Sequence, residues 1–420
     1  MREMSLALAY TQTPSKRAVN ALIIAHYDAH GVSFAGARAR ILRSRGEEVE
    51  IVAKFPETGP QGLSSGSLKN LINVAPQRIE VIDIPIDVRN PDASIKTLAD
   101  LATIAPIYYY DHHETDVPFI PRLHQHGIFA SVFGDNVAMA IALELLNDSV
   151  AKEMAIVGMV ADRDPSVLKL VSKEMVEQHY LPLANRLDVI VRQPQLVGVS
   201  TPGEFAKKWM SGEVMITQFA NVQYPPELLA REISSRVIDE GSIAILVDWS
   251  DQPFQHSQWT PKTLEQLLLI RRKHVAIAVV PGYNPRTRAI EGYDVRVLRY
   301  WLSPSDVPIP EDVVKDLIAQ RAITGNVVGH ADYVSIRFST LEEARNVARV
   351  IFNRIEGMQP TTAHLISDRF VAEAVRRDYR TIIDLLERIA RALERGAEAK
   401  EQQVELLRDL YQRDSRTRYD

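Results

Sequence analysis

The sequence predicts an α/β fold: a doubly wound, mainly parallel sheet domain, a helical linker, a smaller mixed α/β domain and a C-terminal helical extension. One reason is that short apolar runs alternate with helix-like segments over the first 165 residues, which is typical of repeated strand–helix–strand units. Another is that Asp or His follows several of these runs, at the strand ends where open α/β sheets bind ligands. A chain of 420 residues with 46% hydrophobic content can also bury more than one core.

The first domain is expected over residues 1–165. Its strands are predicted at residues 21–25, 48–53, 78–82, 104–110 and 154–160, and its helices at residues 32–45, 68–74, 94–102 and 136–146. Residues 57–67 are rich in Gly, Pro and Ser, which indicates a loop on the surface. Units of this length are expected to place neighbouring strands in parallel.

The rest of the chain divides into three predicted parts. Residues 166–241 form a helical linker, with helices at 170–187 and 226–239. Residues 242–358 form the second domain, with strands at 243–248, 274–280, 293–300 and 333–338 and helices at 261–273, 311–321 and 341–356. Residues 359–420 are charged and helical, with apolar residues spaced three and four apart from Tyr379 to Leu393. These last helices are expected either to pack on the body of the protein or to form a homodimer.

Composition excludes several classes of function. The formal charge of −5 argues against a globally basic nucleic-acid coat, although a local basic groove is compatible with it. The absence of cysteine excludes disulfides, thiolate metal sites and cysteine nucleophiles. The apolar patch at residues 6–10 is too short for a signal-peptide core, and no other run could span a bilayer. We therefore expect a cytoplasmic protein with no membrane partner.

The most informative stretch is Asp111-His112-His113, which directly follows an apolar run. An Asp-His pair can simply cap the turn after a strand. Other predicted strands, however, deliver similar side chains at the same end, which is the pattern of a metal site assembled across a parallel sheet. These side chains are His26, Asp28, His30, Asp83, Asp162 and Asp164. Nitrogen and oxygen ligands of this kind favour Mn²⁺, Mg²⁺ or Zn²⁺.

Four ordered segments resemble the motifs of the DHH phosphoesterase superfamily. They are His26-Tyr27-Asp28-Ala29-His30-Gly31, Asp83, Asp111-His112-His113 and Asp162. This superfamily includes RecJ-type single-strand exonucleases, small oligoribonucleases, cyclic-dinucleotide phosphodiesterases, exopolyphosphatases and family II pyrophosphatases. The resemblance covers residues 20–165 and extends, with a degraded motif, to residues 242–356.

The resemblance implies a role for each position. Asp28 would bind one Mn²⁺ ion, with His26 as a further ligand or as the partner of a ligand, and Asp83 would bridge two ions. His112 and Asp162 would bind the second ion, for which Mg²⁺ or Zn²⁺ could also serve. Of the two implied catalytic residues, Asp111 would orient a histidine from behind, and His113 would face the scissile phosphate.

Two departures from the family pattern stand out. His30 occupies a position where the exonuclease-like branch has a second Asp, so it either binds metal as a neutral imidazole or points away from the site. In the second domain the family's glycine run is replaced by residues 324–328, and only Gly329 and His330 remain. Gly329, His330 and Arg299 are the candidate substrate-binding residues, with a turn histidine and a strand arginine in an ion pair as the structural alternatives.

The leading functional hypothesis is a metal-dependent phosphodiesterase that hydrolyses single-stranded or short oligonucleotides by two-metal activation of water. Within the enzyme class, a cyclic-dinucleotide or polyphosphate phosphohydrolase is the alternative. The alternative of another class is a non-catalytic nucleic-acid-binding or scaffold protein built on a decayed DHH fold, which His30 and the lost glycines would favour.

Overall fold

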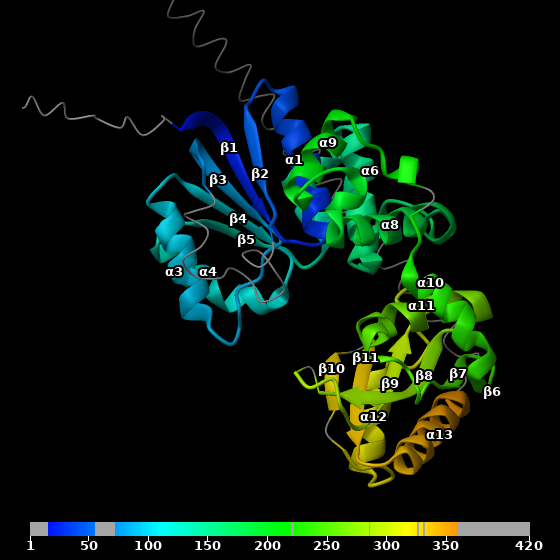
Figure 1. The fold of residues 1–420 in the computed structure, drawn as a ribbon. Coiled ribbons are helices and arrows are strands. Elements are labelled where there is room, and N and C mark those ends of the chain that lie inside the picture. The colour runs from blue at the N-terminus through cyan, green and yellow to red at the C-terminus, as the bar shows by residue number, and fades with distance from the viewer. Residues whose placement is uncertain are drawn as a thin grey trace, which may run out of the picture.

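The computed structural model describes residues 16–54, 72–219, 222–284, 286–325, 327–330 and 332–358. These residues form an α/β fold with one five-stranded parallel sheet and one six-stranded mixed sheet (Figure 1), which confirms the predicted fold class. The predicted loop at 57–67 and C-terminal extension at 359–420 lie outside the described residues, as does most of the helix predicted at 68–74. Within the described part of the chain, no helix is long and apolar enough to cross a membrane. The predicted domain boundaries stay predictions.

The first sheet has the strand order β2-β1-β3-β4-β5. Its strands are β1 (Arg17–Ala25), β2 (Val49–Val52), β3 (Val74–Ile82), β4 (Ile107–Asp111) and β5 (Phe129–Val132). Successive residues of β1 are buried against opposite cores: Ile23 belongs to the cluster that contains α1 (Ala29–Ser44), and Leu22 to the cluster that contains α3 (Pro91–Ala102). Helices α3 and α4 (Ile120–Gln125) lie on one side of the sheet and α1 on the other, so the domain is doubly wound (Figure 1).

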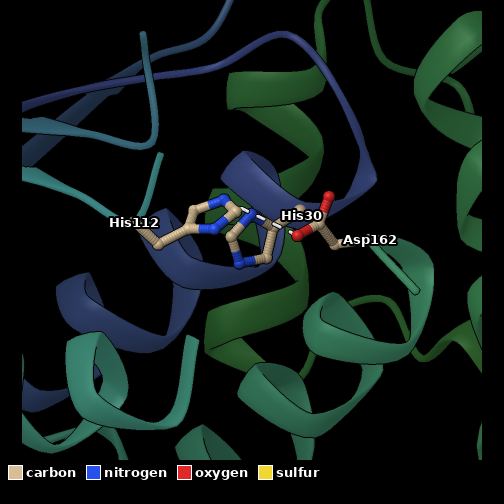
Figure 2. Close-up of side chains that lie close together, drawn as sticks. All are labelled: His30, His112 and Asp162. Atoms are coloured by element: carbon tan, nitrogen blue, oxygen red, sulfur yellow. Dashed lines mark ion pairs between the residues drawn. The ribbon is translucent and has the colours of Figure 1, made fainter. Parts of the chain in front are cut away.

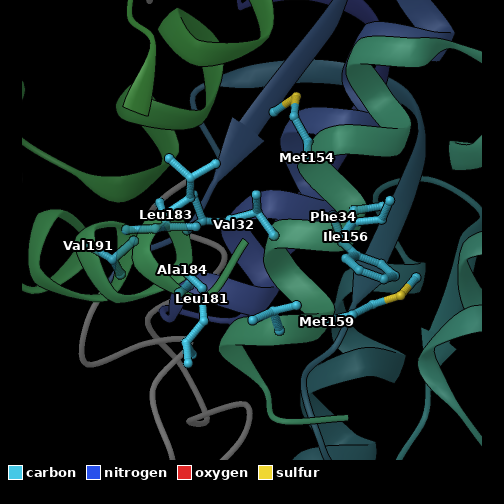
Figure 3. Packing of buried hydrophobic residues seen from close by; sticks show 14 of the residues in the cluster. Val32, Phe34, Met154, Ile156, Met159, Leu181, Leu183, Ala184 and Val191 are labelled. Carbon is cyan, nitrogen blue, oxygen red and sulfur yellow. The ribbon is translucent and has the colours of Figure 1, made fainter. Parts of the chain in front are cut away.

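The strand predicted at 154–160 is wrong, because these residues lie in helix α6 (Ser149–Ala161). The Asp148 side chain caps α6 by accepting hydrogen bonds from the backbone N–H groups of Val150 and Ala151. The helix is buried on several sides, since it packs against α1 and against α8 (Leu181–Arg192), as Figure 3 shows. Burial from several sides removes the helical period from the apolar pattern, and the segment then resembles a buried strand.

The segment before α6 is also shorter than predicted. Helix α5 (Asn136–Ala142) ends before the predicted residue 146, and a 3₁₀ turn at Leu145–Asn147 follows it. Strand β5 was not predicted, because it is short and its side chains are only half buried or exposed.

The region predicted as a helical linker is helical, and all of its helices except the short α7 (Lys173–Met175) form part of the first core. Its helices are α7, a π-helical turn at Val176–Tyr180, α8, α9 (Pro202–Ser211) and α10 (Pro225–Ile233). Side chains of α8 interleave with those of α1 and α6 (Figure 3), and α9 also packs on α1. The helix predicted to reach residue 239 is wrong at its end, because Val237–Glu240 forms strand β6 and pairs with the next strand.

The second sheet has the strand order β10-β11-β9-β8-β7-β6. After β6 its strands are β7 (Ala244–Asp248), β8 (Val275–Tyr283), β9 (Ile290–Arg299), β10 (Val327–His330) and β11 (Tyr333–Phe338). Helices α12 (Pro310–Ala319) and α13 (Leu341–Gly357) cover one face, and α11 (Thr260–Arg271) covers the face turned toward the first domain. The predicted strands and helices of this domain are confirmed, and β10 is an additional strand.

One apolar core joins the two sheets. It runs from α1, α6 and α8 to residues of α11, β7 and β8. Two ion pairs cross the same boundary, Arg163–Glu265 and Lys262–Asp188, and both use residues of α11. The second sheet is therefore attached to the first domain through α11, which places β9 and β11 near the C-terminal end of α6.

Candidate metal centre

The first group of candidate ligands lies between β1 and α1. Asp28 is the N-cap of α1, where one carboxylate oxygen accepts a hydrogen bond from the Gly31 backbone N–H at 2.8 Å. The other carboxylate oxygen lies 2.7 Å from Nδ1 of His26. The cap thus turns the His26–Asp28 pair toward the strand ends, where Asp83 Oδ2 is 4.0 Å from the same His26 nitrogen.

Gly31 is required by a close approach of the backbone. A Cβ atom at this position would lie 2.7 Å from both the Cβ and the carbonyl oxygen of His26. We expect Gly31→Ala to displace His26, to lower the free energy of unfolding by about 1–3 kcal/mol and to weaken metal binding. Urea unfolding and calorimetric titration with Mn²⁺ would measure both effects. Gly134→Ala is the control, because no described atom lies within 4 Å of its added methyl group, and equal behaviour of the two variants would contradict the expectation.

His30 lies within the site and does not point away from it. It sits in the first turn of α1 with only 2% of its surface exposed, and its Nδ1 is 2.7 Å from Oδ2 of Asp83. Burial disfavours the charged imidazole, but the neighbouring Asp83 carboxylate raises the pKa of His30 above its ordinary value. The other ring nitrogen, Nε2, is buried and has no hydrogen-bond partner among the described residues.

Asp83 is the centre of the cluster. It follows β3 with a backbone φ of 60°, a left-handed conformation that costs energy for a residue other than glycine. Besides His30, its carboxylate contacts Nε2 of His112 at 3.1 Å. Burial alone would favour the neutral acid, yet His30 and His112 hold the pKa of Asp83 well below its ordinary value. A buried anion in a strained backbone position is a common feature of functional sites.

The second group of ligands joins α1, the end of β4 and the end of α6. The side chains of His30, His112 and Asp162 point toward one another (Figure 2), and His112 Nε2 is 3.6 Å from Asp162 Oδ2. Asp162 is the C-cap of a helix, so its predicted place at a strand end is wrong. Burial lowers the pKa of His112, but Asp83 and Asp162 together raise it to about 9. The same negative field would attract a divalent cation.

Asp111 and His113 form a separate pair. Asp111 is fully buried, and its Oδ1 accepts hydrogen bonds from Nδ1 of His113 at 2.7 Å and from the His113 backbone N–H at 2.6 Å. The ring of His113 is thereby oriented so that Nε2 faces away from Asp111. The structure therefore brings these residues together in the arrangement that the resemblance implied, while their catalytic role stays a prediction.

The donor atoms fit a metal centre. They form three overlapping groups, each with its ligand atoms within 4.8 Å of one another: His30, His112 and Asp162; Asp83, His112 and His113; His26, Asp28 and Asp83. The buried His30 Nε2 belongs to a residue of the first group and has no protein partner among the described residues. Imidazole and carboxylate donors of this mixture suit Mn²⁺ or Zn²⁺, and the carboxylates also suit Mg²⁺.

Sequence reasoning missed Asn136. This residue is fully buried in the first turn of α5, and its Nδ2 donates to Asp162 Oδ2 at 2.8 Å, so it orients a candidate ligand. In the sequence its position next to Asp135, the N-cap of α5, indicates only a helix start. The neighbouring Asp164 accepts from the backbone N–H groups of Asn136 and Ser166, which is a capping role.

The candidate residues of the second domain are engaged in structural contacts. Arg299 donates to Asp332 at 2.9 Å and to the Pro304 carbonyl at 2.8 Å, so its guanidinium is not free for a bidentate contact with phosphate. Gly329 has a φ of 138°, and a Cβ there would overlap the Tyr333 carbonyl oxygen, so the hairpin itself requires glycine. The His330 backbone lies in β10. Substrate binding by these residues stays a prediction.

Comparisons with known proteins find similarity of fold. No family model and no curated protein match the chain. RecJ from Thermus thermophilus in complex with Mn²⁺ is 14% identical over 81% of this chain and 52% of that chain, with a TM-score of 0.40. The DHH domain of a member of a ribosomal protein family is 13% identical over 82% of this chain and 87% of that one, with a TM-score of 0.38. CDC45 from Entamoeba histolytica is 9% identical over 80% and 95%, with a TM-score of 0.36.

The chain spans about half the length of the RecJ structures that it matches. At these sequence identities, the similarities are of fold alone.

Proposed function

We propose that this chain is a DHH-type phosphoesterase that hydrolyses single-stranded or short oligonucleotides with the help of bound metal ions. The observation that carries the proposal is the cluster of imidazole and carboxylate donors around Asp83, built from segments that are far apart in the sequence. Such a cluster at the strand ends of a parallel sheet is where an α/β enzyme carries out its chemistry.

The donor set divides into two halves that share Asp83. His26 and Asp28 lie on one side of it, and His30, His112 and Asp162 on the other. Two Mn²⁺ ions, or Mg²⁺ or Zn²⁺ in their place, would supply activation of water and neutralisation of the leaving oxygen when bound. Asp83 holds His30 and His112 in position, and Asn136 holds Asp162, so the chain presents these donors with little freedom of movement.

The Asp111–His113 pair would act as a general acid, with the proton on Nε2 of His113. Burial lowers the pKa of His113, but the hydrogen bond to Asp111 and its negative charge raise that pKa above the ordinary value. With Nδ1–H donated to Asp111, His113 would carry its mobile proton on Nε2 and would deliver it to the leaving oxygen.

The non-catalytic alternative keeps one argument in its favour. Asp83 lies 2.7 Å from His30 Nδ1 and 3.1 Å from His112 Nε2, so protein groups alone hold much of the cluster together as a buried network. One group that such a network leaves unexplained is His30 Nε2, which is buried without a hydrogen-bond partner among the described residues. A buried nitrogen of this kind is costly unless it binds something, and a metal ion is the ligand that the surrounding donors favour.

Removal of metal provides the test. We expect the purified chain to release mononucleotides from a labelled short single-stranded oligonucleotide in Mn²⁺, and we expect chelation to reduce the rate by at least about a hundredfold. Renewed addition of Mn²⁺ should restore activity, which separates metal loss from unfolding. Calorimetry on the same preparation would report Mn²⁺ binding directly. A chain that binds no Mn²⁺ and cleaves nothing would support the scaffold alternative.

A further inference from the structure

A buried loop follows Asp83, the central residue of the candidate metal centre. Residues 84–87 have no regular secondary structure, yet Ile84 and Ile86 are 0% and 1% exposed. Backbone N–H and C=O groups that are buried outside a helix or a sheet need hydrogen-bond partners from elsewhere in the protein. In this loop two side chains supply such partners, Tyr109 and Asp116.

Tyr109 and Asp116 hold the loop at two nearby points. The Tyr109 hydroxyl lies 2.9 Å from the Ile84 carbonyl oxygen, and the Ile86 N–H donates to the two carboxylate oxygens of Asp116 at 3.0 and 3.2 Å. The same hydroxyl is hydrogen-bonded to Oδ2 of Asp116, so the two side chains form one unit. Both residues are fully buried, so this unit acts on the site only through the loop that it holds.

The loop begins at a backbone position that is unfavourable by itself. Asp83 has a φ of 60°, and a left-handed residue other than glycine persists only where surrounding contacts fix it. On one side, the Asp83 N–H donates to the Tyr110 carbonyl oxygen at 2.9 Å. On the other side, the contacts of Ile84 and Ile86 with the Tyr109–Asp116 unit hold the chain. Loss of these contacts would let Asp83 relax, and its carboxylate would move away from the other donors.

Asp116 also joins this loop to the candidate general acid. It lies in the 3₁₀ turn Glu114–Phe119, for which His113 is the N-cap residue, and its backbone N–H donates to the His113 carbonyl oxygen at 3.0 Å. Asp116 thus contacts the loop after Asp83 through its side chain and the turn after His113 through its backbone. One residue therefore fixes the position of Asp83 relative to His113.

Stabilisation of the fold alone is a poor account of Asp116. Its side-chain partners are the Ile86 N–H and the hydroxyls of Tyr109 and Thr115, and none of these groups carries a positive charge. A carboxylate buried without a cation is costly, and an apolar side chain of similar size would destabilise the fold less. An apolar side chain, however, could not accept the Ile86 N–H and would leave the loop unheld.

We propose that Asp116, acting with Tyr109, is a positioning residue of the candidate metal centre that holds Asp83 in its left-handed conformation and at a fixed place relative to His113. The proposal rests on the proposed metal-dependent function and adds a residue that touches neither metal nor substrate. Metal affinity and kcat should therefore depend on Asp116, whereas KM should not.

The test compares substitutions that break the unit with one that preserves it. Asp116→Ala removes the acceptor of the Ile86 N–H, and should raise the Kd for Mn²⁺ about 10–100-fold and lower kcat for a short oligonucleotide at least about tenfold, with KM within about threefold. Tyr109→Phe removes the hydroxyl that contacts both Ile84 and Asp116, and should act in the same direction. It carries the test if Asp116→Ala does not fold.

Asp116→Asn is the conservative variant. Its amide oxygen accepts the Ile86 N–H and its amide N–H donates to the Tyr109 oxygen, which leaves the Tyr109 O–H for the Ile84 carbonyl. We therefore expect Kd for Mn²⁺ and kcat to stay within about threefold of the wild type. Impairment of Asp116→Asn as severe as that of Asp116→Ala would overturn the proposed hydrogen-bonding role.

Leu98→Ala is the matched control for loss of stability, because Leu98 is a fully buried residue of α3 in the same apolar core as Tyr109. Urea unfolding should show that Leu98→Ala and Asp116→Ala are both folded and both less stable than the wild type. Only Asp116→Ala should weaken Mn²⁺ binding in calorimetry. Equal weakening by Leu98→Ala, or wild-type Mn²⁺ affinity in Asp116→Ala, would overturn the positioning role.

Calorimetry also separates this proposal from the proposed function. Mn²⁺ binding that depends on Asp116, in a protein that hydrolyses no phosphodiester, would support the positioning role and overturn the phosphodiesterase. Turnover and Mn²⁺ affinity that are unchanged in Asp116→Ala and Tyr109→Phe would overturn the positioning role and leave the phosphodiesterase standing.

Discussion

Asp83→Asn should reduce turnover of a short oligonucleotide by at least about a thousandfold, which corresponds to about 4 kcal/mol of transition-state stabilisation. The substitution keeps the shape of the side chain but removes the charge on which the cluster depends. His30 and His112 both contact this carboxylate, at 2.7 and 3.1 Å, and a shared metal ligand would lose its negative charge at the same time. The variant should therefore lose Mn²⁺ affinity as well as activity.

The measurement is kcat/KM for the oligonucleotide together with a Mn²⁺ titration by calorimetry. Circular dichroism and urea unfolding would show that the variant is folded, since asparagine occupies nearly the same volume as aspartate. Asp92→Asn is the matched control, because Asp92 is an exposed residue of α3 that pairs with Arg122. If Asp83→Asn kept a tenth or more of the wild-type turnover, the assignment of the centre would be wrong.

The candidate centre could be predicted from sequence because its residues follow apolar runs. His26, Asp83 and Asp111 lie at the ends of β1, β3 and β4, and parallel strands bring such ends to one edge of a sheet. The sequence could not show the orientation of His30. Because His30 departs from the family pattern, it could either bind metal or point away from the site. Only its distance of 2.7 Å to Asp83 places it inside the cluster.

Two elements of the first domain were predicted wrongly, one because it is buried on several sides and the other because it is short. Residues 154–160 are apolar without a period because α6 is covered on several sides, and the capping Asp148 upstream was the signal that favoured a helix. Strand β5 is four residues long and half exposed, so no apolar run reveals it.

Contacts between residues far apart in the chain could not be predicted from the sequence. The carboxylate that pairs with Arg299 is 33 positions away, at Asp332. Arg163, which follows α6, and its partner Glu265 on α11 are 102 positions apart. No local pattern marks either pair, because each arises only when separate elements pack together.

We expect substitutions at the Arg163–Glu265 ion pair to be among those that lower the free energy of unfolding most. Arg163 directly follows Asp162 and has a backbone φ of 62°. Its guanidinium donates two hydrogen bonds of 2.7 Å to Glu265 on α11, and others to the Val160 carbonyl and to Asn185. Glu265 is 5% exposed, so loss of the arginine would leave a buried carboxylate without its cation.

Arg163→Met should lower the free energy of unfolding by about 3–5 kcal/mol, because the cost is that of an uncompensated buried charge. The double variant Arg163→Met with Glu265→Leu removes both charges and should recover most of this loss. Urea unfolding of the wild type, the two single variants and the double variant would form a double-mutant cycle that measures the coupling. Arg231→Met is the control, since its pair with Glu227 on α10 is exposed and should contribute less than about 1 kcal/mol.

The same cycle tests whether this pair aligns the two domains at the metal centre. Because the arginine joins α11 to the residue after Asp162, the double variant should regain stability without regaining the full Mn²⁺ affinity of the wild type. Calorimetric titration of the double variant measures this difference directly. If the single Arg163→Met variant were within about 1 kcal/mol of the wild type, the guanidinium would not be compensating a buried charge, and α11 would be held to α6 and α8 by apolar packing and the Lys262–Asp188 ion pair.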